Sequence, residues 1–213
     1  MFHAKLAPMP GRLFLTTPLP DIARHFGCAT GGLTSDPPRH NIAPGQEVLV
    51  LTGRGPRRMR WGLIPVGRVN ARGRPVMETI INARSETVFS KSAFQGIARG
   101  IVPADGWYEW TGEKRKKTAW RIHHADHRLL AFAAIWDIWT APGGQELAQV
   151  AMVTCPPSAD VSGVHHRMGV LLSPPQYDTW LNGEENDLAA LMQPYPDGQL
   201  TVEIAQNVDW NGA

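Results

Sequence analysis

Asn82, Arg84 and Glu86 alternate directly after the apolar run that ends at Ile81. If that run is a strand, the three side chains lie on one face at its end. An Asn amide and an Arg guanidinium on one face can both be directed into a cleft, where they would bind a polar ligand. The plain alternative is a solvated strand edge, on which the same side chains contact only water.

A second candidate is Glu109, which lies in the segment GWYEW between Tyr108 and Trp110. Aromatic surroundings raise the pKa of a carboxyl group, and a raised pKa is typical of a general acid or base. The alternative is an exposed Glu on a strand whose other face lies in the core.

His165 and His166 are adjacent and precede an apolar run, with Arg167 beside them. Neighbouring side chains point in different directions, so we expect at most one of the two histidines to face a given site. The segment has no HxH or HxxxH spacing and no Cys partner, so we expect no metal and no cofactor. A single His that transfers a proton or orients a ligand is the better interpretation.

Two cysteines, Cys28 and Cys155, make neither a disulfide framework nor a zinc ligand set. Cys155 ends an apolar run, which predicts a buried structural thiol. Cys28 has no neighbouring His or basic residue that would activate a thiolate. The sequence therefore gives neither Cys the role of a nucleophile.

Short elements must position these groups, because 21 Gly and 18 Pro are spread through the 213 residues. Apolar and β-branched runs predict strands at 48–52, 79–83, 101–103, 119–123, 129–136, 149–154 and 170–173. Capping and stop signals predict helices at 19–26, 90–98, 174–181 and 185–192. This pattern predicts an α+β single domain, built on an irregular antiparallel β-sheet or open barrel with short peripheral helices.

Charge is divided unevenly along the chain. Residues 1–128 contain 20 Lys and Arg against 9 Asp and Glu, whereas residues 129–213 contain 1 against 10. Residues 48–77 carry seven Arg and no acidic residue, and an Arg-rich segment that contains Trp suits phosphates and bases. The charge therefore favours a nucleic-acid partner, although the two halves could also pack as a dipolar, nearly neutral protein.

The chain has no apolar run near the roughly 18–20 residues of a membrane span, and its first residues do not resemble a signal peptide. We therefore expect a cytoplasmic protein that associates with the nucleoid when it binds DNA. The sequence indicates no membrane contact and no obligate protein partner.

Taken together, seven segments resemble the SRAP domain family (SOS response-associated peptidase), whose members protect abasic sites in single-stranded DNA. They follow the family order and cover nearly the whole chain: PGR at 10–12, NIAPGQ at 41–46, RWGLIP at 60–65, INARSET at 81–87, ADGWYEW at 104–110, VHHRM at 164–168 and NV at 207–208. The resemblance implies an SRAP-like fold and a single-stranded or abasic-site DNA partner.

The resemblance also implies roles for single residues. Asn82 corresponds to the Asn that positions the reacting sugar, Glu109 to the acid that transfers a proton, and His165 to the His that works on the sugar hydroxyls. The positions expected to contact DNA are Arg12, Pro44, Trp61, Arg84, Trp110 and Arg167.

The nucleophile is where the chain departs from the family. The family pattern opens Met-Cys-Gly-Arg, and the terminal Cys reacts with the ring-opened aldehyde of an abasic site. Pro10 occupies the Cys position here, so a thiazolidine-type crosslink cannot form. If translation starts at Met9 and the Met is removed, Pro10 gains a free secondary amine, which can form an iminium with an aldehyde. Residues 1–8 would then be an extension left by a mis-assigned start or by cloning, ahead of an SRAP-like domain at 9–213.

Two further departures are smaller. Val66-Gly67-Arg68 stands where family members often carry a Trp, and Gly169 replaces a Pro. Three functions remain open at this point. The protein forms a reversible iminium with abasic or single-stranded DNA through Pro10, with or without lyase activity; or it binds such DNA without covalent chemistry; or it is a hydrolase or peptidase that uses Glu109 and His165.

Overall fold

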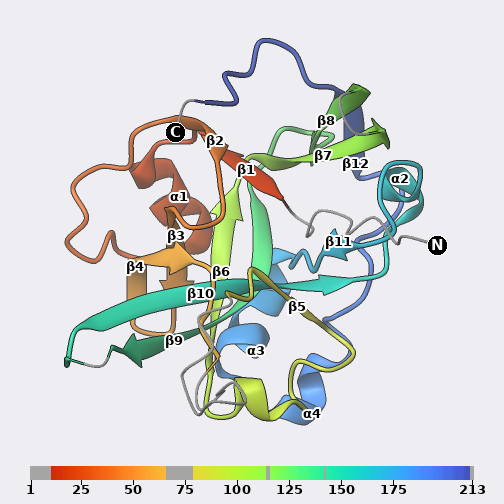
Figure 1. Cartoon of the computed structure of the whole chain (residues 1–213). Coiled ribbons are helices and arrows are strands. Elements are labelled where there is room, and N and C mark those ends of the chain that lie inside the picture. Colours follow the sequence, from red (N-terminus) through yellow and green to blue (C-terminus); the bar gives the residue numbers. More distant parts are fainter. Residues whose placement is uncertain (1–10, 66–78, 114–115, 142, 212–213) are drawn as a thin grey trace.

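Strands dominate the computed structural model, which describes residues 11–65, 79–113, 116–141 and 143–211 (Figure 1). Within these ranges twelve strands form two sheets, and the helices are few and short. The predicted α+β class is therefore confirmed.

The first sheet is antiparallel throughout and has the strand order β12-β8-β7-β1-β2. Its strands are β1 (Arg12–Leu15), β2 (Arg39–Ile42), β7 (Gly106–Glu113), β8 (Lys116–His124) and β12 (Leu200–Ile204). At its centre Arg12 pairs with Tyr108 and Leu13 with Trp107. This register sets the beginning of the described chain against the strand that carries Glu109.

The second sheet has the order β11-β10-β4-β3-β6-β9, and β5 lies beside β10. Its strands are β3 (Glu47–Thr52), β4 (Gly55–Trp61), β5 (Asn82–Arg84), β6 (Ala98–Ala104), β9 (Leu130–Thr140), β10 (Glu146–Cys155) and β11 (Met168–Gly169). β10 also pairs with β9, so the order returns on itself, while β3 and β6 pair at Leu51 and Ile101. This irregular sheet is mostly antiparallel, as the sequence predicts, but β10 runs parallel to β4 and β5.

The helices are α1 (Leu19–Phe26), α2 (Ala159–Ser162), α3 (Tyr177–Asn182) and α4 (Glu185–Leu188), with 3₁₀ turns at Ser92–Phe94 and Pro174–Gln176. α1 has the predicted bounds, because Pro18 precedes it and Gly27, at φ 62°, ends it. α3 is held to the second sheet by the Trp180 indole N–H, which donates to the Gly100 carbonyl at 2.9 Å. Among the described residues, no helix has the length and apolar character needed to cross a membrane.

The core lies between and inside the sheets, and its largest side chains are fully buried: Trp61, Trp107, Phe132 and Trp180. Trp107 of β7 packs edge-on against Phe132 of β9 with ring centroids 5.6 Å apart, which joins the two sheets. Gly106 permits the close packing of β7 with its neighbours β1 and β8, since a Cβ there would lie 2.2 Å from the Ile122 carbonyl oxygen and 2.5 Å from the Phe14 ring.

Two predicted elements are wrong. The expected helix at 90–98 is a 3₁₀ turn at Ser92–Phe94, because Gly96 has φ 75° and Ala98 already pairs with Trp136 in a strand. The expected strand at 170–173 is displaced toward the N-terminus: β11 is Met168–Gly169, and Leu171 makes only an isolated bridge to Phe132. The expected helix at 185–192 is shorter and ends at Leu188.

Candidate functional site

Glu109 lies in the middle of β7, where its side chain is only 4% exposed. Because β1 and β7 are antiparallel and Arg12 pairs with Tyr108, continuing the register by one residue sets Gly11 opposite Glu109. β7 lies between β1 and β8 in the first sheet, and its residues Trp107, Tyr108 and Glu109 are all buried. The exposed-Glu alternative is therefore wrong.

The environment of Glu109 favours its protonated form. Burial raises the pKa of the carboxyl well above its usual value of 4.5, and the backbone N–H of Gly11 and the indole N–H of Trp107 offset only part of that rise. Oε1 is buried and has no hydrogen-bond partner among the residues that the structure describes. A buried, protonated carboxyl is suited to donating a proton to a leaving group.

Asn82 and Arg84 begin and end β5, and they pair in parallel with Met152 and Thr154 of β10. Both line a hollow of about 1180 Å³, to which the turn after β5 contributes Lys91. Asn82 is half-buried and Arg84 exposed. An amide and two basic groups therefore lie on the wall of a large open hollow, whereas Glu86, the third residue of the alternation, pairs with Arg167 instead.

His165 lies in the loop between α2 and β11. Its Nδ1 lies 3.1 Å from the backbone N of Arg167 and 3.2 Å from the carbonyl oxygen of the same residue, so the Arg167 backbone holds the ring in either tautomer. Nε2 is buried and has no partner within the described ranges. Burial, and then the neighbouring His166, lower the pKa of His165, which favours the neutral ring. His166 is exposed and stacks on His165 with centroids 4.4 Å apart, so only one of the two histidines faces inward.

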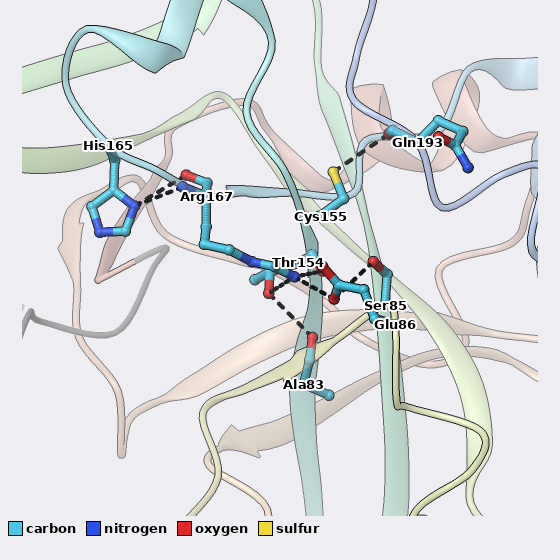
Figure 2. A network of polar contacts seen from close by, with 8 residues as sticks. All are labelled: Ala83, Ser85, Glu86, Thr154, Cys155, His165, Arg167 and Gln193. Carbon is cyan, nitrogen blue, oxygen red and sulfur yellow. Dashed lines mark hydrogen bonds and ion pairs between the residues drawn. The ribbon is translucent and has the colours of Figure 1, made fainter.

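Arg167 binds protein rather than solvent in the unliganded chain (Figure 2). Its guanidinium makes a two-point ion pair with Glu86, with Nη2 2.9 Å from Oε2, and Nη2 also donates to the carbonyl and hydroxyl oxygens of Thr154. The side chain is 15% exposed. Both terminal nitrogens are therefore engaged inside the protein, and the expected phosphate contact of Arg167 stays a prediction.

Arg12 and Trp110 lie near the C-terminal segment. The Arg12 guanidinium donates to the Asn41 side-chain oxygen, and the Asn41 amide donates to the Asp209 carbonyl at 2.8 Å. The Trp210 ring then lies edge-on to both Tyr108 and Trp110, with centroids 5.0 and 5.3 Å away. Trp110 and Trp210 are both half-buried, so they form a partly accessible aromatic surface beside a basic group.

Two expected DNA contacts lie in the turn between β2 and β3 and at the end of β4. Trp61 is completely buried, and its indole N–H donates to the Ile81 carbonyl at 3.0 Å. The expectation that its side chain contacts DNA is therefore wrong, because the ring is part of the core. Pro44 is half-buried, and the residue after it, Gly45, donates its N–H to the Trp61 carbonyl at 2.7 Å.

The end of β10 brings together Asn82, Arg84 and the loop that carries His165, because β5 and β11 both pair with residues 152–155. Glu109 belongs to the other sheet, and no hydrogen bond between described residues joins it to Asn82 or His165. Pro10 lies outside the described residues, so its expected role stays a prediction. Its chain neighbour Gly11 is described, and it lies against Glu109.

In the described ranges, no group of three or more His, Cys, Asp or Glu side chains is arranged to hold a metal ion. Cys155 is fully buried, as predicted, and burial raises the pKa of its thiol to about 12. Burial also raises the pKa of Cys28. A thiolate nucleophile is therefore disfavoured at both positions.

Sequence reasoning assigned no role to Asn41, Thr154 or Trp210, although each contacts a candidate residue. Asn41 stands in the NIAPGQ segment, and that segment could have drawn attention to it. Thr154 and Trp210 give no local signal, because their partners are 13 and about 100 residues away in the chain. Glu86 does share the alternation of Asn82 and Arg84, but only the fold shows its pairing with Arg167.

Comparisons with known proteins agree with this arrangement. The profile of the family SOS response associated peptidase (SRAP) matches residues 9–209. The chain is similar to the abasic site processing protein YoqW of Bacillus subtilis, at 34% identity over an alignment of 169 residues that covers 74% of each chain. It is also similar to the abasic site processing protein YedK of Escherichia coli, at 31% identity over 153 residues, covering 68% of this chain and 65% of YedK.

Solved structures share the fold. A protein of Bacteroides thetaiotaomicron superposes with a TM-score of 0.79 at 21% identity, with 92% of each chain covered. A protein of Bordetella bronchiseptica gives a TM-score of 0.77 at 23% identity, covering 92% of this chain and all of the other. A profile that spans nearly the whole sequence, together with relatives above 30% identity, shows that the chain belongs to the SRAP family.

Proposed function

We propose that this protein processes abasic sites in DNA, and that it binds them in single-stranded DNA and captures them through a reversible iminium on Pro10. Its relatives YoqW and YedK are named abasic site processing proteins. The uneven charge and the hollow that exposes Arg84 and Lys91 suit a polyanion. The family assignment and the electrostatics therefore support the same class of partner.

The observation that carries the proposal is the buried carboxyl of Glu109 beside the backbone of Gly11. Gly11 is bonded to Pro10, the residue at the position of the family nucleophile. A protonated carboxyl close to that position supplies the acid–base group that the capture of an aldehyde needs. A surface carboxylate would be ionised at pH 7 and could not donate.

The chemistry balances with these groups alone. The unprotonated secondary amine of a terminal Pro10 attacks C1′ of the open-chain sugar, which forms a C–N bond and moves the carbonyl electrons onto oxygen. Proton transfer from nitrogen to oxygen gives a neutral carbinolamine. Glu109 then donates its proton to the hydroxyl, water leaves, and the nitrogen lone pair forms the C=N⁺ bond of the iminium. Hydrolysis reverses each step and returns the proton to Glu109.

Asn82 and His165 assist at the sugar in this proposal. The Asn82 amide, on the wall of the hollow, orients the reacting sugar, and the buried Nε2 of His165 forms a hydrogen bond with a sugar hydroxyl. Arg84 contacts phosphate, while Trp110 offers an aromatic face to a base.

The proposal is tested with two proteins, one that starts at Met1 and one that starts at Met9 with removal of the Met confirmed by mass spectrometry. Each is mixed with single-stranded DNA that contains one abasic site, with and without borohydride. We expect a trapped adduct from the Met9 protein alone, with its mass located on Pro10.

DNA binding without any adduct from either protein would leave a noncovalent DNA-binding member of the family. Absence of both binding and adduct would remove abasic DNA as the substrate. Hydrolysis of a peptide, without DNA binding and without an adduct, would instead favour a hydrolase that uses Glu109 and His165.

A further inference from the structure

The segment that follows β12 crosses one face of the first sheet (Figure 1). β12 lies at one edge of this sheet and β2 at the other. At Ala205 the segment still lies beside β8, because its N–H donates to the Ala119 carbonyl at 2.9 Å. Further along, the Asp209 carbonyl accepts a hydrogen bond from the Asn41 amide of β2 at 2.8 Å. The segment therefore spans the sheet from edge to edge, and its Trp210 ring packs against β7.

Strand pairing shows which other side chains share this face. Residues directly opposite each other in an antiparallel pair have their side chains on the same side of the sheet. Arg12 is opposite Tyr108, and Lys117 is opposite Gly112. Trp110 lies two residues from each of these β7 positions, so it belongs to the same face. The face therefore has Trp110 at its centre, with a basic residue on either side along β7.

Both tryptophan rings on this face remain partly accessible. Trp110 and Trp210 are half-buried, whereas Tyr108 is only 2% exposed and its hydroxyl donates to the His40 carbonyl at 3.1 Å. The Trp210 ring plane makes an angle of 82° with Tyr108 and 63° with Trp110. Neither contact is a face-to-face stack, so the two tryptophans do not cover each other's faces. A nucleobase stacks through such a face.

The charges around the two rings suit a nucleic-acid strand. Arg12 and the exposed Lys117 form no ion pair with a described residue. Arg121 is neutralised by Glu203 at 2.8 Å, and the Asp209 carboxylate accepts a backbone N–H at 2.9 Å. Aromatic rings set between unpaired basic groups are typical of surfaces that bind single-stranded nucleic acid without sequence preference.

We propose that Trp210 is a base-binding residue, which together with Trp110 stacks on a nucleobase of the strand that carries the abasic site. The inference rests on the proposed function, in which Trp110 alone has this role. It adds a residue from the segment that crosses the sheet. Because Glu109 and Trp110 are consecutive in β7, the stacked base belongs to a nucleotide close to the reacting sugar.

The test compares Trp210→Ala with Trp139→Ala in the full chain. Trp139 is a matched control, because it is also half-buried but lies on β9 in the other sheet. Binding is measured on single-stranded DNA that contains a tetrahydrofuran analogue of the abasic site, which has no aldehyde and forms no iminium. We expect affinity to fall about 5- to 140-fold in Trp210→Ala, the equivalent of 1–3 kcal/mol for one stacked base.

The salt dependence separates stacking from charge. The slope of log affinity against log salt should be unchanged in Trp210→Ala, because no phosphate contact is lost. Trp139→Ala should bind like the wild type, and Trp210→Phe, which keeps a ring, should retain most of the affinity. Wild-type affinity in Trp210→Ala, or an equal loss in Trp139→Ala, would overturn the inference.

A second measurement removes the base in place of the ring. The bases on both sides of the lesion are deleted one at a time, and each DNA is titrated against the wild type and Trp210→Ala. Deletion of the stacked base should weaken binding by the wild type and have a much smaller effect on the variant, because the two changes remove the same contact. Additive effects at every position would reject the stacking role.

Failure of the proposed function looks different from failure of this inference. If the wild type forms no adduct and binds intact and lesion-containing strands equally, abasic-site processing is rejected, while a loss of affinity in Trp210→Ala still supports stacking. If the adduct forms and Trp210→Ala binds and reacts like the wild type, processing stands and the role of Trp210 is rejected. A wild type that binds no single-stranded DNA would reject both.

Discussion

The carboxyl of Glu109 lies opposite the backbone of Gly11, across the antiparallel pair of β1 and β7. This relationship places a buried acid next to the segment that the family uses for its nucleophile. It also explains the raised pKa, since the two nearby N–H groups only partly compensate for removing the carboxylate from water.

Glu109→Gln should slow adduct formation by about 10²–10⁴-fold, because the amide cannot donate the proton that leaves with water. Affinity for abasic DNA should hardly change, since the side chain is buried and contacts no solvent-facing phosphate. Borohydride trapping over time measures the first quantity, and binding of DNA with a reduced abasic site measures the second. An equal loss of both would assign Glu109 a structural role.

The same substitution should alter the dependence of stability on pH. The folded-state pKa of Glu109 lies above the unfolded value, so its contribution to stability is fully present below pH 4.5 and is lost as pH rises through the folded pKa. Wild-type melting temperature should therefore fall relative to Glu109→Gln as pH rises from 4.5 toward neutral. Parallel curves for the two proteins would show that the carboxyl is not protonated in the folded state.

Arg84→Ala should weaken DNA binding and reduce the slope of log affinity against log salt by about 1, as expected for one lost phosphate contact. Arg84 is exposed and lines the hollow, so its loss leaves the core intact. Arg24→Ala is the control, because Arg24 is also exposed but pairs with Asp21 on α1. A salt slope that falls equally in both variants would reflect net charge rather than a contact.

Signals in the local sequence predicted elements whose ends are set by residues close by in the chain. α1 has its expected bounds because Pro18 and Gly27 mark its two ends. The apolar runs predicted no strand at β1, β2, β4, β7 or β12. β4 and β7 were missed because Gly and charged residues interrupt their apolar residues. The segment at 90–98 has helical composition, but pairing of β6 with β9 overrides that preference.

The sequence indicated candidate residues for the site but not their arrangement. Alternation indicated that Asn82, Arg84 and Glu86 share a face, and aromatic neighbours indicated the burial of Glu109. The pairing of Glu86 with Arg167 spans 81 residues, so no local pattern could show it. The prediction for Trp61 was wrong because a Trp beside Arg residues is typical of a DNA contact, and only the fold shows that its ring is buried.

Trp61 and Trp110 should therefore respond differently to substitution. Trp61→Ala should lower the free energy of unfolding by about 3–5 kcal/mol, because it removes a fully buried ring. Trp110→Ala should cost little stability, and it should reduce single-strand affinity by roughly 1–3 kcal/mol if a base stacks on the ring. Denaturant unfolding and DNA titration separate the two effects. Wild-type affinity in Trp110→Ala would remove that ring from the DNA surface.

The cysteines provide a final test of the nucleophile. Burial raises the pKa of Cys155 to about 12 and also raises that of Cys28, so neither offers a thiolate at neutral pH. The double variant Cys28→Ser/Cys155→Ala in the protein that starts at Met9 should form the borohydride-trapped adduct at the wild-type rate. Acetylation of the Pro10 amine should abolish the adduct in both proteins. Loss of the adduct in the double variant, with folding intact, would instead assign the reaction to a thiol and exclude the iminium on Pro10.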